Sequence, residues 1–265
     1  MQIVGYDSGI RDLGYNPAEG ITGSVEPAAL LMANEGMLSR VELKPGTGLE
    51  YTLGERHCAG SISNGGHTPC PNPGAPYCPV HDDDWPCASC RGQCDLPIEA
   101  CREEHAIYLA AFAPSTFKVG VTRLNRLATR LREQGADRGA HLQAVSTGRL
   151  ARRIETELAE SVPDRVPVDT KVAGLHRTVD RGAWEGLLDR YDLIRTFEFE
   201  YELALTEQPV RETLLTGTVV GTQGRLLVLE RNGGRYAVDL RDLVGYDVTA
   251  QAADRELQAN LGAFG

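Results

Sequence analysis

The hydrophobic pattern divides the chain into strand-rich ends and a mixed centre. Residues 1–57 carry short apolar runs, such as AALLM and SRVELK, broken by glycine, asparagine and proline, which predicts short strands joined by turns. Residues 206–265 contain three further strand patterns, two of them separated by Asn232-Gly233, a strong signal for a tight hairpin. We therefore expect β-rich N- and C-terminal elements that form a small sheet or barrel.

The segment 105–163 alternates between the periods of strands and helices. HAIYLAAF and FKVGVT predict two strands around a turn, and the leucine spacing of RLNRLATRLRE predicts an amphipathic helix that ends at Gly135. HLQAVST predicts a third strand, and GRLARRIETELAESV predicts a second helix with Leu150, Ile154 and Leu158 on one face. The predicted order is ββαβα and the fold class is α+β. Residues 164–205 follow as a helical and strand linker region.

Residues 58–104 differ in composition from the rest of the chain. They hold all seven cysteines and half of the fourteen prolines, with few apolar residues, so this segment cannot build a hydrophobic core of its own. Thiolates and imidazoles at short spacing are the ligands that tetrahedral zinc selects, and a site closed by four protein ligands is structural. We therefore predict a zinc-binding segment.

Seven cysteines and one histidine are enough for two zinc ions. The first predicted ligand set is Cys58, Cys70, Cys78 and His81, and the second is Cys87, Cys90, Cys94 and Cys101. His57, His67 and His105 are substitute ligands. Disulfides are disfavoured by the odd cysteine count and by the lack of an export signal, while an iron–sulfur cluster and buried free thiols stay open as alternatives.

The charge pattern adds a second clue. The chain carries a formal charge of −10, which argues against coating nucleic acid through its overall field, and 24 of its 27 basic residues are arginine. Acidic, arginine-rich and lysine-poor chains resemble haloarchaeal proteins, with high-GC bacteria as the alternative source. No segment resembles a signal peptide or a membrane span, so we expect a cytoplasmic protein without membrane partners.

The ββαβα segment has the opposite charge balance, with nine basic against five acidic residues over 106–160. It also carries one residue of each type needed to cleave a phosphodiester. Tyr108 can orient or deprotonate a water, Lys118 and Arg130 can neutralise phosphate, and Glu155 can hold magnesium or manganese. Five further arginines form a possible phosphate track: Arg123, Arg126, Arg132, Arg149 and Arg153.

The same residues resemble the GIY-YIG nuclease superfamily. Ala106-Ile107-Tyr108 stands where that family has Gly-Ile-Tyr, and Lys118-Val119-Gly120 stands where it has Tyr-Ile-Gly, ten positions later. Arg130 and Glu155 match the arginine and glutamate of the family helices. The resemblance implies a GIY-YIG-like ββαβα domain and a metal-dependent endonuclease. Lys118 in place of the second tyrosine is the main departure.

Most of the chain also resembles the domain of unknown function 2797 family. That resemblance rests on the cysteine-rich segment, HAIYLA, KVGVTR, the threonine–arginine helix ending in Gln134-Gly135-Ala136, and GTVVGTQGRLLVL. It implies no established activity. We therefore carry three hypotheses: a zinc-stabilised protein that cleaves DNA or RNA, a module that binds structured nucleic acid without cutting it, and a protein-interaction scaffold. The oligomeric state is left open.

Overall fold

The computed structural model describes residues 1–10, 13–82 and 101–253. The chain forms two compact units. The terminal unit comprises residues 1–9, 26–83 and 201–265, so it joins the two ends of the sequence, and the central unit comprises residues 10–25 and 84–200. No helix in the described part of the chain combines the length and the apolar character needed to cross a bilayer.

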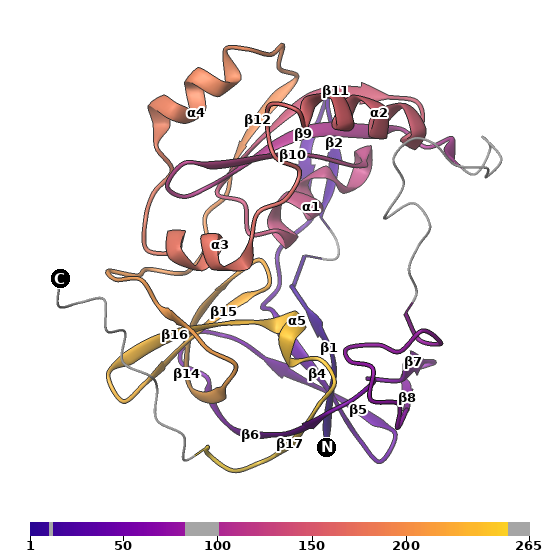
Figure 1. The fold of residues 1–265 in the computed structure, drawn as a ribbon, viewed down its shortest axis with the longest axis vertical. Helices are drawn as coiled ribbons and strands as arrows, with labels where there is room; N and C mark the ends of the chain where they lie inside the picture. The colour runs from indigo at the N-terminus through magenta and orange to yellow at the C-terminus, as the bar shows by residue number, and fades with distance from the viewer. Residues whose placement is uncertain (11–12, 83–100, 254–265) are drawn as a thin grey trace. The chain divides into compact units, whose positions relative to one another are not determined.

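The terminal unit is built on one eleven-stranded sheet. Its strand order is β13-β16-β15-β14-β6-β17-β1-β4-β5-β8-β7 (Figure 1). C-terminal strands lie at one end and N-terminal strands at the other, and β6 and β17 interleave where the two groups meet. Because β13 and β7 pair with one neighbour each among the described strands, the sheet is open and larger than the small sheet or barrel predicted. Its elements are β1 (Gln2–Asp7), β4 (Ala29–Asn34), β5 (Met37–Glu42), β6 (Gly48–Arg56), β7 (Ser61–Ser63), β8 (Gly66–Thr68), β13 (Val210–Arg211), β14 (Leu215–Gln223), β15 (Leu226–Arg231), β16 (Gly234–Asp239), the short helix α5 (Leu240–Leu243) and β17 (Tyr246–Thr249).

Strand β6 joins the two halves of this sheet. Its first half pairs with β14 and its second half pairs with β17, both antiparallel. One hydrophobic core draws buried side chains from both ends of the sequence, including Ile3, Leu30, Leu49 and Leu227. The predicted Asn-Gly hairpin is confirmed, because Asn232 and its glycine both have positive φ and join β15 to β16.

The central unit has a four-stranded sheet in the order β10-β9-β11-β12. The predicted order of two strands, helix, strand and helix is present as β9, β10, α1, β11 and α2. Its elements are β2 (Gly14–Asn16), β3 (Gly20–Thr22), β9 (His105–Phe112), β10 (Thr116–Arg123), a 3-10 turn (Leu124–Arg126), α1 (Leu127–Glu133), β11 (Arg138–Val145), α2 (Gly148–Leu158), α3 (Val168–Gly174), α4 (Arg181–Leu188) and β12 (Arg195–Glu198).

Helices cover both faces of this sheet (Figure 1). On one face, Ile107 and Leu109 of β9 share a core cluster with Ala151 of α2 and Trp184 of α4. On the other face, Gly139 of β11 lies directly under the Leu131 side chain of α1. The face covered by α1 is the one that carries Tyr108, because residues alternate between faces along a strand.

Two sequence predictions need correction in this unit. Leu150 was expected on the buried face of the second helix, but its side chain is 43% exposed, and Ala151 with Ile154 and Leu158 makes the contact instead. FEFEYELAL, residues 197–205 of the helical and strand linker region, has a strand-like pattern, but the strand is regular only as far as Glu198. Helix α1 ends as predicted, with Gly135 at a φ of 70°.

Candidate functional sites

A cluster of three cysteines and one histidine lies in the terminal unit. One ligand atom from each of Cys58, Cys70, Cys78 and His81 falls within 4.8 Å of all the others. His81 Nδ1 lies 3.4 Å from the sulfurs of Cys58 and Cys78, and the sulfurs of Cys70 and Cys78 are 4.0 Å apart. With zinc bonds of about 2.3 Å to sulfur and 2.0 Å to nitrogen, a tetrahedron requires separations of roughly 3.5–3.8 Å. The cluster could therefore bind a metal such as zinc.

Backbone groups prepare the sulfur atoms for this role. The N–H groups of Gly60 and Cys78 donate to the sulfur of Cys58, at 3.4 and 3.3 Å. Burial alone would raise the pKa of the Cys78 thiol, but hydrogen bonds from the Val80 backbone and from His81 lower it to about 6. Because thiolates rather than thiols bind metal, these contacts favour the form that zinc requires.

Two of the substitute histidines hold the backbone around the cluster. His57 Nδ1 lies 2.9 Å from the carbonyl oxygen of Cys70, and His67 Nε2 lies 2.7 Å from that of Ala59. Both rings therefore bond to carbonyl groups next to or within the ligand set. Contacts of this kind orient the ligands of a metal without coordinating it.

The second predicted zinc site falls mostly outside the described residues. Cys87, Cys90 and Cys94 lie there, and only Cys101 is described. The Cys101 sulfur accepts a hydrogen bond from the backbone N–H of Arg149, at 3.0 Å, near the start of α2. A Cβ atom placed on Gly148 would meet both the Cys101 sulfur, at 3.2 Å, and the His105 ring, at 3.0 Å. Cys101 and the substitute ligand His105 therefore converge on one glycine.

Tyr108 occupies the centre of the α1-covered face in the central unit. In the β9–β10 ladder it lies opposite Gly120, and Lys118 lies opposite Ala110, so Tyr108 and Lys118 share this face. A Cβ atom at Gly120 would come within 2.5 Å of the tyrosine ring and hydroxyl. The glycine of the Lys-Val-Gly triplet therefore makes room for the tyrosine ring.

The Tyr108 hydroxyl is influenced by two residues at the end of α1. Gln134 Nε2 donates to it at 2.6 Å, and the positive charge of Arg130 acts on it electrostatically. Burial, aided by the negative charge of Glu155, raises the pKa of Tyr108 despite both groups, so the hydroxyl stays protonated at neutral pH. The tyrosine is 1% exposed, whereas the Arg130 side chain is 49% exposed. Arg130 is thus the outer group of this pair.

The pKa of Lys118 depends on the same two charged residues that affect Tyr108. Burial and the positive charge of Arg130 lower the pKa of Lys118 to about 8, while the charge of Glu155 opposes that shift. Arg130 and Glu155 therefore both act electrostatically on Tyr108 and on Lys118. Glu155 also forms an ion pair with Arg152, at 2.7 Å, and its side chain is 13% exposed. Tyr108 and Lys118 thus each lie within electrostatic range of both Arg130 and Glu155.

The five arginines predicted as a phosphate track have different surroundings. Arg123 pairs with Glu103 at 2.6 Å and Arg126 pairs with Glu133 at 2.9 Å. Arg132 stacks over the Phe199 ring, 5.2 Å from its centroid. Arg149 is partly buried at the start of α2, and Arg153 is exposed on that helix. Each of these arginines therefore has its own local contacts, and the phosphate track stays a prediction.

Sequence reasoning missed the buried polar group behind Tyr108. His141 is fully buried in β11, directly opposite Tyr108, and its Nδ1 lies 3.0 Å from the hydroxyl of Tyr15. Burial lowers the pKa of this imidazole. Tyr15 belongs to the β2–β3 hairpin, 126 residues away in sequence, so no local pattern could have indicated the contact.

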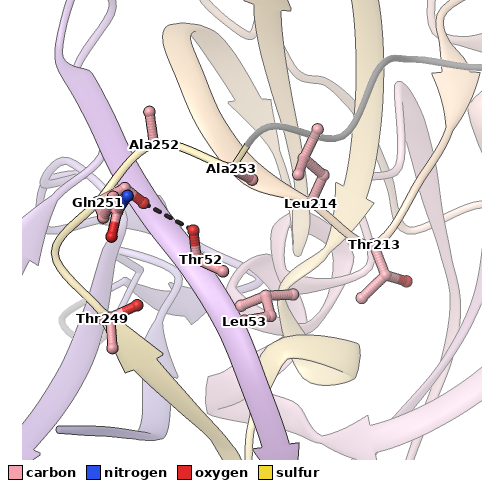
Figure 2. A pocket seen from close by; sticks show the side chains of 8 residues that line it. All are labelled: Thr52, Leu53, Thr213, Leu214, Thr249, Gln251, Ala252 and Ala253. Atoms are coloured by element: carbon pink, nitrogen blue, oxygen red, sulfur yellow. Dashed lines mark hydrogen bonds between the residues drawn. The ribbon is translucent and has the colours of Figure 1, made fainter.

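Two surface pockets lie apart from the predicted residues. In the terminal unit, Thr52 donates to the carbonyl of Gln251 at 2.9 Å across a pocket that also contains Leu53 and Leu214 (Figure 2). In the central unit, a groove beside the β9–β10 turn is lined by Phe117, Pro163 and Arg190, among others. Neither lining includes a predicted catalytic residue or a zinc ligand.

The comparisons with known proteins bear on the central unit. No curated protein and no solved structure matches the chain. One family model matches the chain, over a shorter stretch than the sequence resemblance predicted. The matched residues leave out the Cys58–His81 cluster and the C-terminal strands. They do include Tyr108, Lys118, Arg130 and Glu155. Residues 85–207 match the family described as protein of unknown function (DUF2797), which assigns no activity to its members.

Proposed function

We propose that the central unit is a GIY-YIG-like domain that acts on nucleic acid, and that the terminal unit holds a structural zinc ion. One observation carries the first part. The charges of Arg130 and Glu155 both act on Tyr108 and Lys118, in a ββαβα unit with the order expected for such a domain. The excess of basic residues over 106–160 supports an anionic ligand.

The exposure of each side chain suggests its role. Arg130 is half exposed and lies 3.5 Å from the Glu133 carboxylate, and Lys118 is partly buried. Both would offer positive charge to phosphate oxygens. Tyr108 is buried and protonated, which favours a role in positioning Arg130 over one in deprotonating water. Gln134 holds the same hydroxyl and fixes the orientation of the ring.

Cleavage requires a further group near the phosphate. Glu155 offers carboxylate oxygens, the donor type that magnesium and manganese prefer. It would supply one ligand to the cation, and substrate phosphate and water would supply the others. Such a cation would neutralise charge that builds up on the phosphate during hydrolysis. We propose divalent-metal-dependent cleavage of phosphodiester bonds on this basis.

The test of cleavage compares two glutamates of α2. Wild type, Glu155→Ala and Glu157→Ala are purified alike and incubated with DNA and RNA in high salt, with magnesium or manganese. We expect wild type and Glu157→Ala to cut and Glu155→Ala to lose at least 100-fold in rate. Equal residual cutting by all three proteins would refute the enzymatic proposal.

A second function has its own support. The Arg152–Glu155 ion pair, at 2.7 Å, occupies the carboxylate that a catalytic cation needs. That contact favours a module that binds structured DNA or RNA through Lys118 and Arg130 without cleaving it. Filter binding that survives Glu155→Ala but is lost in Lys118→Ala and Arg130→Ala, with no cleavage by wild type, would select this function.

A further inference from the structure

The chain has three lysines, and their surroundings differ. Lys44 forms an ion pair with Glu42 at 2.5 Å. Lys171 donates to the carbonyl oxygen of Gln134 at 2.8 Å and lies 4.4 Å from the centroid of the Phe112 ring. Lys118 has neither a hydrogen bond nor an ion pair to any residue that the structure describes. It is therefore the one lysine whose amine is not engaged within the described chain.

Lys118 is partly buried and also lies at the edge of its sheet. It lies on β10, an edge strand of the four-stranded sheet, on the same face as Tyr108. It is partly buried, and Arg130 stands close enough for its positive charge to disfavour a second cation. With a pKa of about 8, on the order of a tenth of the lysine is neutral at pH 7. That fraction exceeds the value for an ordinary lysine by about two orders of magnitude.

A partly neutral amine beside an arginine is suited to one class of electrophile. Lysines of this kind attack carbonyl carbons and form imines, and a guanidinium binds a phosphate next to the carbonyl. In nucleic acid, a carbonyl flanked by phosphates occurs at an abasic site, where the open form of the sugar is an aldehyde. We propose that Lys118 is a nucleophile for the C1′ aldehyde of abasic sites in DNA, an activity that rests on the nucleic-acid contact proposed above.

The reaction balances without a metal or a redox partner. The Nζ lone pair attacks C1′, and loss of one water gives a protonated imine. The Glu155 carboxylate takes a proton from C2′, and the electron pair expels the 3′ phosphate as a C2′–C3′ double bond forms. Arg130 stabilises the charge on the departing phosphate. One water then hydrolyses the imine, which restores the lysine and releases an unsaturated aldehyde.

The experiment traps the imine. Wild type, Lys118→Arg and Lys44→Arg are mixed with a DNA duplex that holds one abasic site, with cyanoborohydride and no added divalent cation. Reduction makes the imine permanent, so a covalent protein–DNA adduct appears on a denaturing gel. We expect equal adduct in wild type and Lys44→Arg and at least tenfold less in Lys118→Arg, with the adduct mapped by peptide analysis to Lys118.

Arginine keeps the positive charge at position 118, and adduct is compared at equal amounts of bound duplex, so that loss of the nucleophile is separated from any change in binding. No adduct in wild type, or equal adduct in Lys118→Arg, would overturn the inference. The result is independent of hydrolysis of intact DNA. An adduct without magnesium-dependent cutting supports the lysine chemistry while refuting the hydrolase, and cutting without an adduct does the reverse. In Glu155→Gln we expect the trapped adduct to persist and strand scission to fall.

Discussion

At the scale of single residues, the charge state of Lys118 depends on the fold. Its side chain is partly buried near Arg130, and its pKa falls to about 8 from an ordinary 10.5. Because the unfolded chain holds the proton more tightly, the charged lysine lowers the stability of the folded state. This cost is present in full below pH 8 and disappears as the pH rises toward 10.5.

Replacing Lys118 by methionine therefore makes the protein more stable at pH 7. We expect a gain of about 1–2 kcal/mol in the free energy of unfolding, reduced by partial exposure of the lysine, and a difference that shrinks above pH 8. Urea unfolding at pH 7 and pH 10 measures both values. Lys44→Met, at an exposed lysine, serves as the control, and a Lys118→Met difference that does not change with pH would contradict the account.

The sequence predicted the metal-ligand set correctly because its four residues lie close together in the chain. Cys58, Cys70, Cys78 and His81 span 24 residues, and their spacing alone identified the set that the structure brings together. The surroundings of Tyr108 were not predictable in the same way. Its neighbour His141 forms a hydrogen bond with Tyr15, and that contact depends on tertiary packing rather than on any local pattern.

At the scale of elements, the β9–β10 hairpin depends on a glycine as much as on its strand-forming residues. Gly120 lies against the Tyr108 ring, and Gln134 at the end of α1 donates a hydrogen bond to the hydroxyl. Sequence periodicity predicted the hairpin, both helices and their order. It failed for Leu150, because a spacing of four residues cannot tell which neighbouring row of the helix meets the sheet.

Gly120→Ala is expected to displace the tyrosine ring. The new Cβ atom would lie 2.5 Å from the ring, which is closer than packed carbon atoms approach, so we expect a loss of about 1–3 kcal/mol in stability. Gly186→Ala in α4 is the matched control. No atom lies within 4 Å of its added Cβ, and alanine in a helix is expected to gain about 0.5–1 kcal/mol. Equal urea midpoints for the two variants would refute this packing.

At the scale of the whole molecule, the cluster of Cys58, Cys70, Cys78 and His81 lies where distant parts of the terminal unit meet. Gln2 Nε2 donates to the carbonyls of Cys58 and Gly245, at 3.3 and 3.1 Å, and the backbone of His57 bonds to Gly245. These contacts join the start of β1, the end of β6 and the turn before β17. The sequence predicted strands at both ends but not their interleaved order, which depends on pairings between residues some 200 positions apart.

Loss of the cluster should therefore loosen the terminal unit. Cys78→Ala is expected to abolish zinc binding at this site and to lower stability by several kcal/mol, because metal binding adds directly to folding free energy. His57→Gln is expected to keep zinc with an affinity about 10–100-fold weaker, since it disturbs the hydrogen bond to the Cys70 carbonyl and leaves the four ligands in place. Zinc titration followed by urea unfolding measures both effects.

Ser63→Ala, on the exposed strand β7, is the control for that series. A chelator that leaves the unfolding curve and protease resistance of wild type unchanged would contradict a structural role for the metal.

Both proposed functions of the central unit require that Arg130 contacts nucleic acid. The most direct test is the affinity of Arg130→Ala for single-stranded and duplex oligonucleotides at several salt concentrations, beside Arg181→Ala. Arg181 is 78% exposed on α4 of the same unit and pairs with Glu185. We expect Arg130→Ala to bind about tenfold more weakly, with a salt dependence reduced by about one phosphate contact, while Arg181→Ala matches wild type. Equal binding by all three proteins, or none by wild type, would contradict this expectation.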